Sequence, residues 1–256
     1  MAETGTAGGP SRLARILLAL AMAGAFCVLL ALGFWQLQRL EWKEGLIAAA
    51  SERPQMAAVA APGPDLWPLD LAAWNYRRVA LTGTFGADEA HVWIALADPN
   101  GAMGGPGYFV VAPFTTEDGW HVLINRGFVP EGRKDRATRP DSAPPDGVVR
   151  VEGLVRRNDP PTFMTPAPNP DTNVWFSRDV TAMAEAFGLP AAATAPYNVD
   201  LVAAETPPGG LPQAGESRIA FTNRHLEYAF TWFGLAACLV GVSAVALFRG
   251  RRTRRH

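Results

Sequence analysis

Cysteine is nearly absent from this sequence. The 256 residues contain two, Cys27 and Cys238, and both fall inside long apolar runs. The segment between these runs, residues 38–227, therefore has no disulfide framework and no CxxC or CxxxC copper-binding motif. Disulfide exchange and thiol-based copper delivery are excluded as activities of that segment.

Histidine is also scarce, and the motifs of common catalytic sites are missing. Segment 38–227 contains His91, His121 and His225, and no GxSxG, HExxH, P-loop or GxGxxG arrangement surrounds them. His91 and His121 lie in strand-like runs beside tryptophans, where a structural role is the simpler interpretation. We predict that the protein is not an enzyme and assign no catalytic residue. A membrane-anchored enzyme of unknown reaction is the less favoured alternative.

Lysine is rare as well, with 2 Lys against 21 Arg, and the charges are unevenly placed. Segment 38–227 has 16 basic side chains and 23 acidic ones, a net charge of −7, although the whole chain carries only −1. Nucleic-acid binding requires clustered basic residues. The basic residues between Arg133 and Arg139 are diluted by acidic ones, and we interpret this run as a solvated loop. We expect no nucleic-acid partner.

Two long apolar runs predict membrane helices. Tyr228–Phe248 has 21 residues without a charge, and at about 1.5 Å per residue it extends roughly 30 Å, enough to cross a bilayer. Ile16–Leu32 has 17 uncharged residues and is extended by Gly33–Trp35. We place the spans at residues 16–37 and 228–248. A cleaved signal peptide is the alternative for the first run, but its apolar core exceeds the usual 7 to 15 residues or so.

Basic residues at both ends predict the topology. Arg12 and Arg15 precede the first span, and five arginines lie in residues 249–256. The positive-inside rule places both termini, 1–15 and 249–256, in the cytoplasm and residues 38–227 outside. Only about 15 residues precede the first span, which favours a bacterial cytoplasmic (inner) membrane over an organelle and a periplasmic location for the main domain.

The segment between the spans is predicted to be rich in β-structure. Trp35, Arg39, Trp42 and Leu46 share one helical face, so the first helix should continue as a stalk over residues 38–53. Short β-branched and aromatic runs then predict strands at 78–85, 91–96, 108–114, 120–124, 148–155, 174–177 and 195–202. Asp179 should cap a short helix over 180–187. The predicted fold is a membrane α+β protein whose two transmembrane helices flank one barrel-like β-rich domain.

The start of the second span carries the first candidate site. His225, Tyr228 and Trp232 are spaced i, i+3 and i+7, so they share a helical face at the water boundary. Tyr and Trp are typical of an interfacial aromatic belt, in which the histidine would be incidental. The alternative is that His225 offers an imidazole nitrogen to a metal or haem iron, with the aromatic rings packing against the macrocycle.

Further candidate residues lie where the first span ends and within segment 38–227. Trp35, Gln36 and Arg39 are at the same predicted depth as His225, and Arg39 is suited either to pairing with a haem propionate or to snorkelling. In Asn125–Pro130, Gly127 suggests a bulge or positive φ, and Pro130 ends the pairing. Arg126 there could reach an anionic group, or equally satisfy carbonyls or a carboxylate at a strand end.

Three ordered motifs carry a family resemblance. Gly33–Lys43 (GFWQLQRLEWK), Gly107-Tyr108 leading to Asn125–Pro130 (NRGFVP), and Asn223–Phe233 (NRHLEYAFTWF) together resemble the Surfeit locus protein 1 family over nearly the whole chain. These proteins are assembly factors for haem-copper cytochrome c oxidase. Where the family often has Asn-Asn-His-Leu-Gln-Tyr, this chain has Arg224 and Glu227.

The resemblance implies a function and partners. Bacterial members are associated with binding haem a and helping its insertion into the oxidase's catalytic subunit. His225 would then be the axial ligand of the haem iron, held transiently, with Trp35, Gln36 and Arg39 nearby. The implied partners are that catalytic subunit, the enzyme that synthesises haem a, and further copies of this chain. A non-haem scaffold that stabilises oxidase assembly intermediates remains the alternative.

Overall fold

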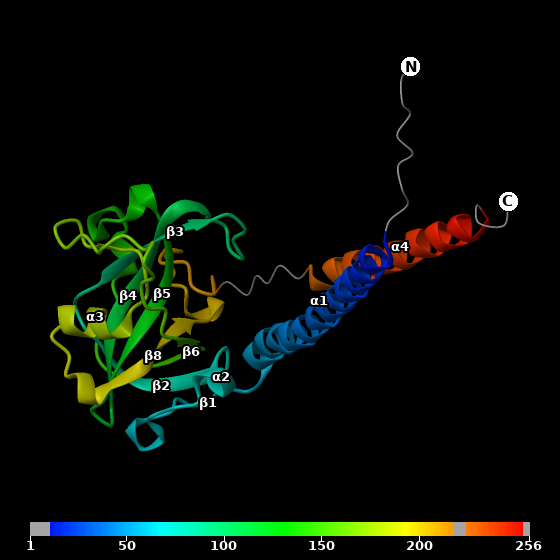
Figure 1. Ribbon diagram of the computed structural model, residues 1–256. Coiled ribbons are helices and arrows are strands. Elements are labelled where there is room, and N and C mark those ends of the chain that lie inside the picture. Colours follow the sequence, from blue (N-terminus) through cyan, green and yellow to red (C-terminus); the bar gives the residue numbers. More distant parts are fainter. Residues whose placement is uncertain (1–10, 218–223, 253–256) are drawn as a thin grey trace. The chain divides into compact units, whose positions relative to one another are not determined.

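The computed structural model describes residues 11–217 and 224–252 of the chain (Figure 1). They form two compact units. One contains the long helix α4 (His225–Arg252) and most of the long helix α1 (Arg12–Glu52), through Ala48. The other covers residues Ala49–Ile219.

Both long helices have the composition of membrane spans. The candidate spans are Arg12–Gln55 and His225–Ala246, whose most apolar windows have mean hydropathies of 2.6 and 1.9. Only 6% and 11% of those windows is buried within the protein, whereas a core helix of a soluble protein would be mostly buried. α1 continues without interruption to Glu52, because its first proline, Pro54, comes in the 3-10 turn that follows.

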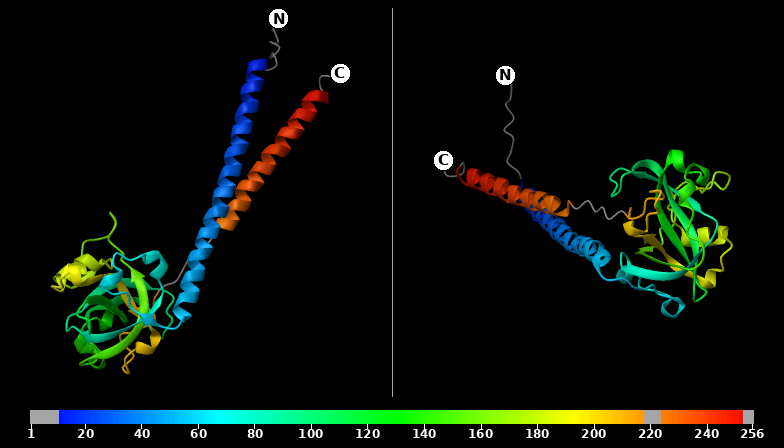
Figure 2. Two further views of the ribbon diagram at one scale, coloured as in Figure 1. Left: turned by 90° about the horizontal axis from the view of Figure 1, so that it is seen from below. Right: turned by 180° about the vertical axis from the view of Figure 1, so that it is seen from behind.

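The two helices are antiparallel within their unit. The left view of Figure 2 shows the N-terminal end of α1 (blue) and the C-terminal end of α4 (red) at the same end of the pair. The helices approach near the start of α4 and diverge towards those ends. Contacts at the close end include the rings of Phe34 and Phe233, whose centroids are 5.4 Å apart.

The other unit contains eight strands. They are β1 (Val59–Ala60), β2 (Arg78–Phe85), β3 (Ala90–Leu96), β4 (Gly105–Thr116), β5 (His121–Pro130), β6 (Val149–Arg157), β7 (Val174–Trp175) and β8 (Thr194–Leu201). Their order is β1-β2-β6-β8-β5-β4-β3-β7, and an additional pairing between β2 and β4 closes a ring of five strands, β2, β6, β8, β5 and β4. This closed barrel confirms the predicted β-rich, barrel-like domain between two apolar helices.

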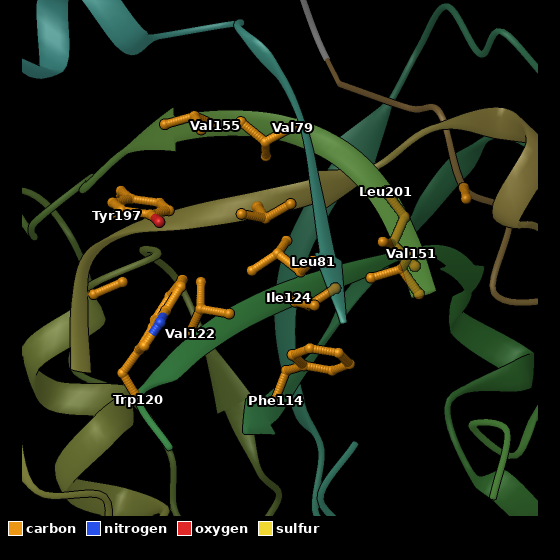
Figure 3. Close-up of a cluster of buried hydrophobic side chains, with 13 residues drawn as sticks. Val79, Leu81, Phe114, Trp120, Val122, Ile124, Val151, Val155, Tyr197 and Leu201 are labelled. Atoms are coloured by element: carbon orange, nitrogen blue, oxygen red, sulfur yellow. The ribbon is translucent and has the colours of Figure 1, made fainter. Parts of the chain in front are cut away.

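Alternating side chains of the ring fill the barrel (Figure 3). On β2, for example, Val79 and Leu81 are buried while their sequence neighbours are more exposed, as expected for a strand with one face towards a core. Every strand of the ring contributes to this cluster, which includes Phe114, Val122, Ile124, Val151, Val155, Tyr197 and Leu201. The hydroxyl of Tyr197 donates to the carbonyl of Pro62 at 2.8 Å, which satisfies its one buried donor.

Short helices complete the barrel unit. α2 (Leu71–Trp74) is capped by Asp70. α3 (Val180–Ala186) is capped by Asp179, whose carboxylate accepts from the backbone N–H groups of Thr181 and Ala182, as the sequence predicts. Gly188 follows in the left-handed conformation, with φ of 67°. Val180 and Met183 of α3 pack against a second apolar cluster that includes Phe109 and Phe128.

The structure confirms the bulge and positive φ suggested at Gly127 and the end of pairing at Pro130, and it corrects two other predictions. The strand predicted to end at residue 124 continues to Pro130, because its pairing with β4 resumes beyond a bulge at Arg126: Gly127 pairs with Val110, and Asn125 pairs with Val111. Gly127 has φ of 133°, and a Cβ there would lie 2.3 Å from the carbonyl oxygen of Gln213. The basic run Arg133–Arg139 is not simply solvated, because Arg139 is buried and pairs with Glu89.

Candidate functional site

The close end of the helix pair is built from small residues. Gly33 of α1 is buried against Phe233 of α4, and a Cβ at Gly33 would lie 2.5 Å from that ring. On α4, Ala229 and Ala236 are buried two turns apart on one face. Small residues allow helices in a membrane to approach closely, so this packing fixes the position of the neighbouring polar side chains.

His225 and Gln36 form a hydrogen bond at this interface. The Nδ1 atom of His225, the first residue of α4, lies 2.7 Å from Oε1 of Gln36, which is buried one turn beyond Gly33 on α1. A carbonyl oxygen can only accept, so Nδ1 must carry the hydrogen. In the neutral imidazole Nε2 then holds the lone pair and is the nitrogen suited to binding a metal.

The aromatic residues of the predicted face differ in their surroundings. The side chains of Trp35 and Tyr228 are exposed on their helices. Trp232 is half-buried, and its indole Nε1 atom is buried without a hydrogen-bond partner among the described residues. A buried N–H that lacks an acceptor is unfavourable in an apolar environment. Trp232 therefore holds a buried donor that is unsatisfied among the described residues.

Arg39 lies one turn beyond Gln36 on α1. Its guanidinium carbon is 3.8 Å from the centroid of the Trp42 ring, a cation–π arrangement. Among the residues that the structure describes, no carboxylate lies within ion-pair distance of Arg39. Arg39 is thus an exposed positive charge whose orientation is set by Trp42.

Arg126 belongs to the barrel unit. The β5 bulge buries its side chain, and its Nη1 atom donates to the carbonyl of Ser142 at 2.9 Å. Burial lowers the pKa of Arg126 to about 10, so the group stays charged at neutral pH. It borders a cavity of about 310 Å³ together with Phe85, Pro145, Pro207 and Pro208, and also Asp141 and Glu205.

A charge network around the carboxylate of Glu89 was not predicted from the sequence. Its carboxylate contacts Arg139, lies 2.9 Å from Nη2 of Arg136, and lies 3.2 Å from Nε2 of His91. Burial acts to raise the pKa of Glu89, but the contacts with His91, Arg136 and Arg139 outweigh it and lower that pKa to about 2. Nothing in the sequence pairs Glu89 with Arg136 and Arg139, which lie 47 and 50 positions later. Only its proximity to His91, two residues away, could have been read from the sequence.

A second buried carboxylate, Asp200, is also held by arginine. It accepts from Nη1 of Arg178 at 2.9 Å, from the Ser217 hydroxyl at 2.7 Å and from the Asn125 amide at 3.1 Å. Burial acts to raise the pKa of Asp200, but Arg178, Arg156 and these hydrogen bonds lower it overall. Both carboxylates thus have structural partners within the barrel unit.

Conventional metal ligands do not gather anywhere in the described part of the chain. Across residues 11–217 and 224–252, no group of three or more His, Cys, Asp or Glu side chains is placed to hold a metal ion. Nδ1 of His121 is 3.0 Å from the Thr115 hydroxyl. His91 lies beside Glu89, although neither of its buried ring nitrogens forms a hydrogen bond among the described residues. The helix pair around His225 therefore remains the strongest candidate site.

Comparison with known proteins identifies relatives over most of the chain. The family model described as the SURF1 family matches residues 23–237. A SURF1-like protein of Monosiga brevicollis is 36% identical over 217 residues, which cover 80% of this chain and 78% of the relative. Surfeit locus protein 1 of Homo sapiens is 34% identical over 218 residues, covering 80% and 69%. The chain, with its barrel between two apolar helices, therefore belongs to the SURF1 family.

Proposed function

We propose that this protein is a membrane-anchored assembly factor for haem-copper cytochrome c oxidase, that it binds haem a through His225, and that it assists insertion of the haem into the catalytic subunit. The observation that carries the proposal is the His225–Gln36 pair, which fixes the imidazole at the start of α4. A metal-binding histidine is commonly held through its other ring nitrogen in this way.

The residues around His225 fit a haem better than a bare metal ion. A bare ion needs three or four side-chain ligands, and the described residues gather no such set. A haem brings four nitrogen ligands of its own, so His225 alone would be enough to hold it. A single axial bond also suits a carrier, which must release its cargo.

Each neighbouring residue has a role in this proposal. Gln36 would keep the lone pair of His225 on Nε2. Trp232, whose indole N–H has no partner in the described part of the chain, would donate to an oxygen of the ligand. Trp35 and Tyr228 present apolar rings to the macrocycle, and Arg39 pairs with a propionate. The role of Arg126 as an anion-binding residue remains a prediction. Arg126 is buried beside a cavity, and no carboxylate lies at ion-pair distance from its guanidinium among the described residues.

We also propose where the protein and its barrel unit are located in the cell. The two candidate spans and the arginines beyond each of them support a bacterial inner membrane protein with both termini in the cytoplasm and the barrel in the periplasm. The antiparallel arrangement of α1 and α4 suits this topology. The site would then lie at the outer boundary of the bilayer, where an apolar macrocycle and charged propionates are both accommodated.

The absorption spectrum of the chain, purified in detergent from cells that make haem a, tests the assignment. The wild-type chain should carry haem a, and His225→Ala should lose most of its absorbance. His121→Ala is the matched control, because His121 is a half-buried histidine of the barrel and its loss should leave the spectrum unchanged. An unchanged spectrum in His225→Ala would show that the assignment is wrong.

The same purification distinguishes the proposed haem chaperone from the main alternative, a non-haem scaffold. A non-haem scaffold would contain no haem a in the wild-type chain, yet deleting the chain would still reduce the amount of assembled oxidase. A haem chaperone requires both the bound pigment and the loss of assembly.

A further inference from the structure

The loop between β6 and β7 exposes two large apolar side chains. Phe163 is 96% exposed and Met164 is 75% exposed. No large apolar side chain described on α1 or α4 exceeds 69%, the value for Phe230 and Val242, although those helices have the composition of membrane spans. Exposed apolar groups of this size in a water-facing domain are typical of an interaction site.

Hydrogen bonds and prolines hold the tip of this loop in one shape. The backbone N–H of Thr165 donates to the carbonyl of Thr162 at 3.0 Å, which closes a turn with Phe163 and Met164 at its centre. The backbone N–H of Thr162 donates back to the Thr165 hydroxyl at 2.9 Å. The prolines at 160, 161, 166 and 168 restrict the arms on either side. The tip is therefore preorganised.

The base of the loop is fixed by the barrel unit rather than by its apolar tip. The Asn158 side chain accepts from the backbone N–H of Val180 at 2.8 Å. At the other end, Asn169 and Val174 exchange two backbone hydrogen bonds, at 2.8 and 3.1 Å. Because Phe163 and Met164 are so exposed, they contribute little to holding the fold.

The charge of the loop, which lies at its base, distinguishes a protein surface from an anionic lipid surface. Residues 158–173 contain Asp159 and Asp171 and no Lys or Arg, a net charge of −2. Peripheral loops that dock on anionic lipids combine apolar residues with Lys or Arg. Here Lys134 contacts the base of the loop, at the carbonyl of Thr172, and not its tip. The loop is thus complementary to an apolar pocket with a basic rim.

We propose that the Thr162–Thr165 turn inserts Phe163 and Met164 into an apolar, basic-rimmed pocket of a partner protein. The inference rests on the proposed function, under which the partner is the catalytic subunit of the oxidase. Two apolar anchors presented by a rigid turn are the kind of residues that dominate an interface, because little conformational entropy is lost when they are buried.

The test uses the full-length chain in cells that express a tagged oxidase catalytic subunit. The double variant Phe163→Ser/Met164→Ser should reduce co-purification of the chain with that subunit about tenfold or more, the effect expected for loss of two interface anchors. Val148→Ser is the matched control, because Val148 is an exposed apolar residue elsewhere in the barrel unit. Asp171→Lys should weaken co-purification, because it reverses one of the two negative charges at the base of the loop, which the rim of the pocket would contact.

The outcomes separate this inference from the proposed function. If the wild-type chain co-purifies and the double variant does so equally well, the inference fails and the proposed function stands. If the wild-type chain does not co-purify with the subunit, both fail. Flotation with vesicles of neutral and of anionic phospholipids tests whether the turn binds lipid instead. If the double variant loses lipid binding but co-purifies with the subunit as well as wild type does, the turn binds the membrane and the inference is wrong.

Discussion

Under the proposed function, the hydrogen bond between His225 and Gln36 orients the haem ligand. Replacing Gln36 with Leu keeps the imidazole but removes the acceptor that orients it. Loss of such a supporting partner typically weakens metal binding about 10- to 100-fold. We expect Gln36→Leu to weaken haem binding by a similar factor in a titration of the purified apo-protein. Gln38→Leu, an exposed position of the same helix, should titrate like wild type.

The ionisation of Glu89 should contribute to the acid stability of the barrel unit. Its pKa is lowered from 4.5 to about 2, so its contribution to stability is complete above pH 4.5 or so and is lost as the pH falls towards 2. A shift of this size corresponds to about 3 kcal/mol. Glu89→Gln should therefore lower the free energy of unfolding at pH 7 and make it depend less on pH below 4.5.

Urea unfolding of the full-length chain in detergent, followed by tryptophan fluorescence at pH 7 and pH 3, measures this effect. Glu117→Gln is the control, because Glu117 is exposed in the β4–β5 hairpin and should leave the unfolding midpoint unchanged. Equal midpoints for Glu89→Gln and wild type at pH 7 would show that Arg139 does not depend on this carboxylate for its burial.

At the scale of elements, Gly33 sets the separation of α1 and α4. A side chain at this position would collide with the Phe233 ring, so Gly33→Leu should push the helices apart and break the His225–Gln36 bond. The matched control is Gly24→Leu, because a Cβ at Gly24 would meet nothing within 4 Å. Haem binding should fall in Gly33→Leu and persist in Gly24→Leu.

The native cysteines allow a direct measurement of the same change. Cys27 on α1 and Cys238 on α4 are both exposed within the helix pair, so spin labels at these two positions report the distance between the helices. The distance measured by pulsed electron resonance should increase in Gly33→Leu relative to wild type. An unchanged distance would mean that Phe233 moves aside and that Gly33 does not determine the approach.

Sequence patterns predicted those elements well whose structure depends on neighbouring residues. β2 occupies residues 78–85 as predicted, because its side chains alternate between the core and the outside, and Asp179 caps α3. The bulge at Arg126 was only half visible: Gly127 suggested it, but the continuation of β5 depends on pairing with β4. The Glu89–Arg139 contact joins distant positions through the fold, and no periodicity encodes such a pairing.

The candidate site could be predicted only in part, because it also depends on contacts between distant residues. Helical spacing placed His225, Tyr228 and Trp232 on one face, yet Tyr228 is exposed and Trp232 is half-buried, because burial depends on where α1 lies. The pairing of His225 with Gln36 requires two helices to meet. From the sequence, these two residues shared only an expected depth.

At the scale of the whole molecule, the proposed topology places the barrel outside the cytoplasm. Val148→Cys, at an exposed position of the barrel unit, should react with a membrane-impermeant maleimide in intact spheroplasts. Ser11→Cys, just before α1, should react only after the membrane is permeabilised. The native cysteines should stay unlabelled, because lipid covers their helices. Labelling of Ser11→Cys in intact spheroplasts would contradict the topology.

The His225–Gln36 bond also has a consequence for the order of events during biosynthesis. Its two residues are 189 positions apart, on the first and last helices of the chain. A ribosome must therefore translate the whole barrel and begin α4 before the bond can form. If His225 is the ligand, a nascent or truncated chain that lacks α4 has no site for haem a. Haem binding can then begin only after translation has reached the last helix.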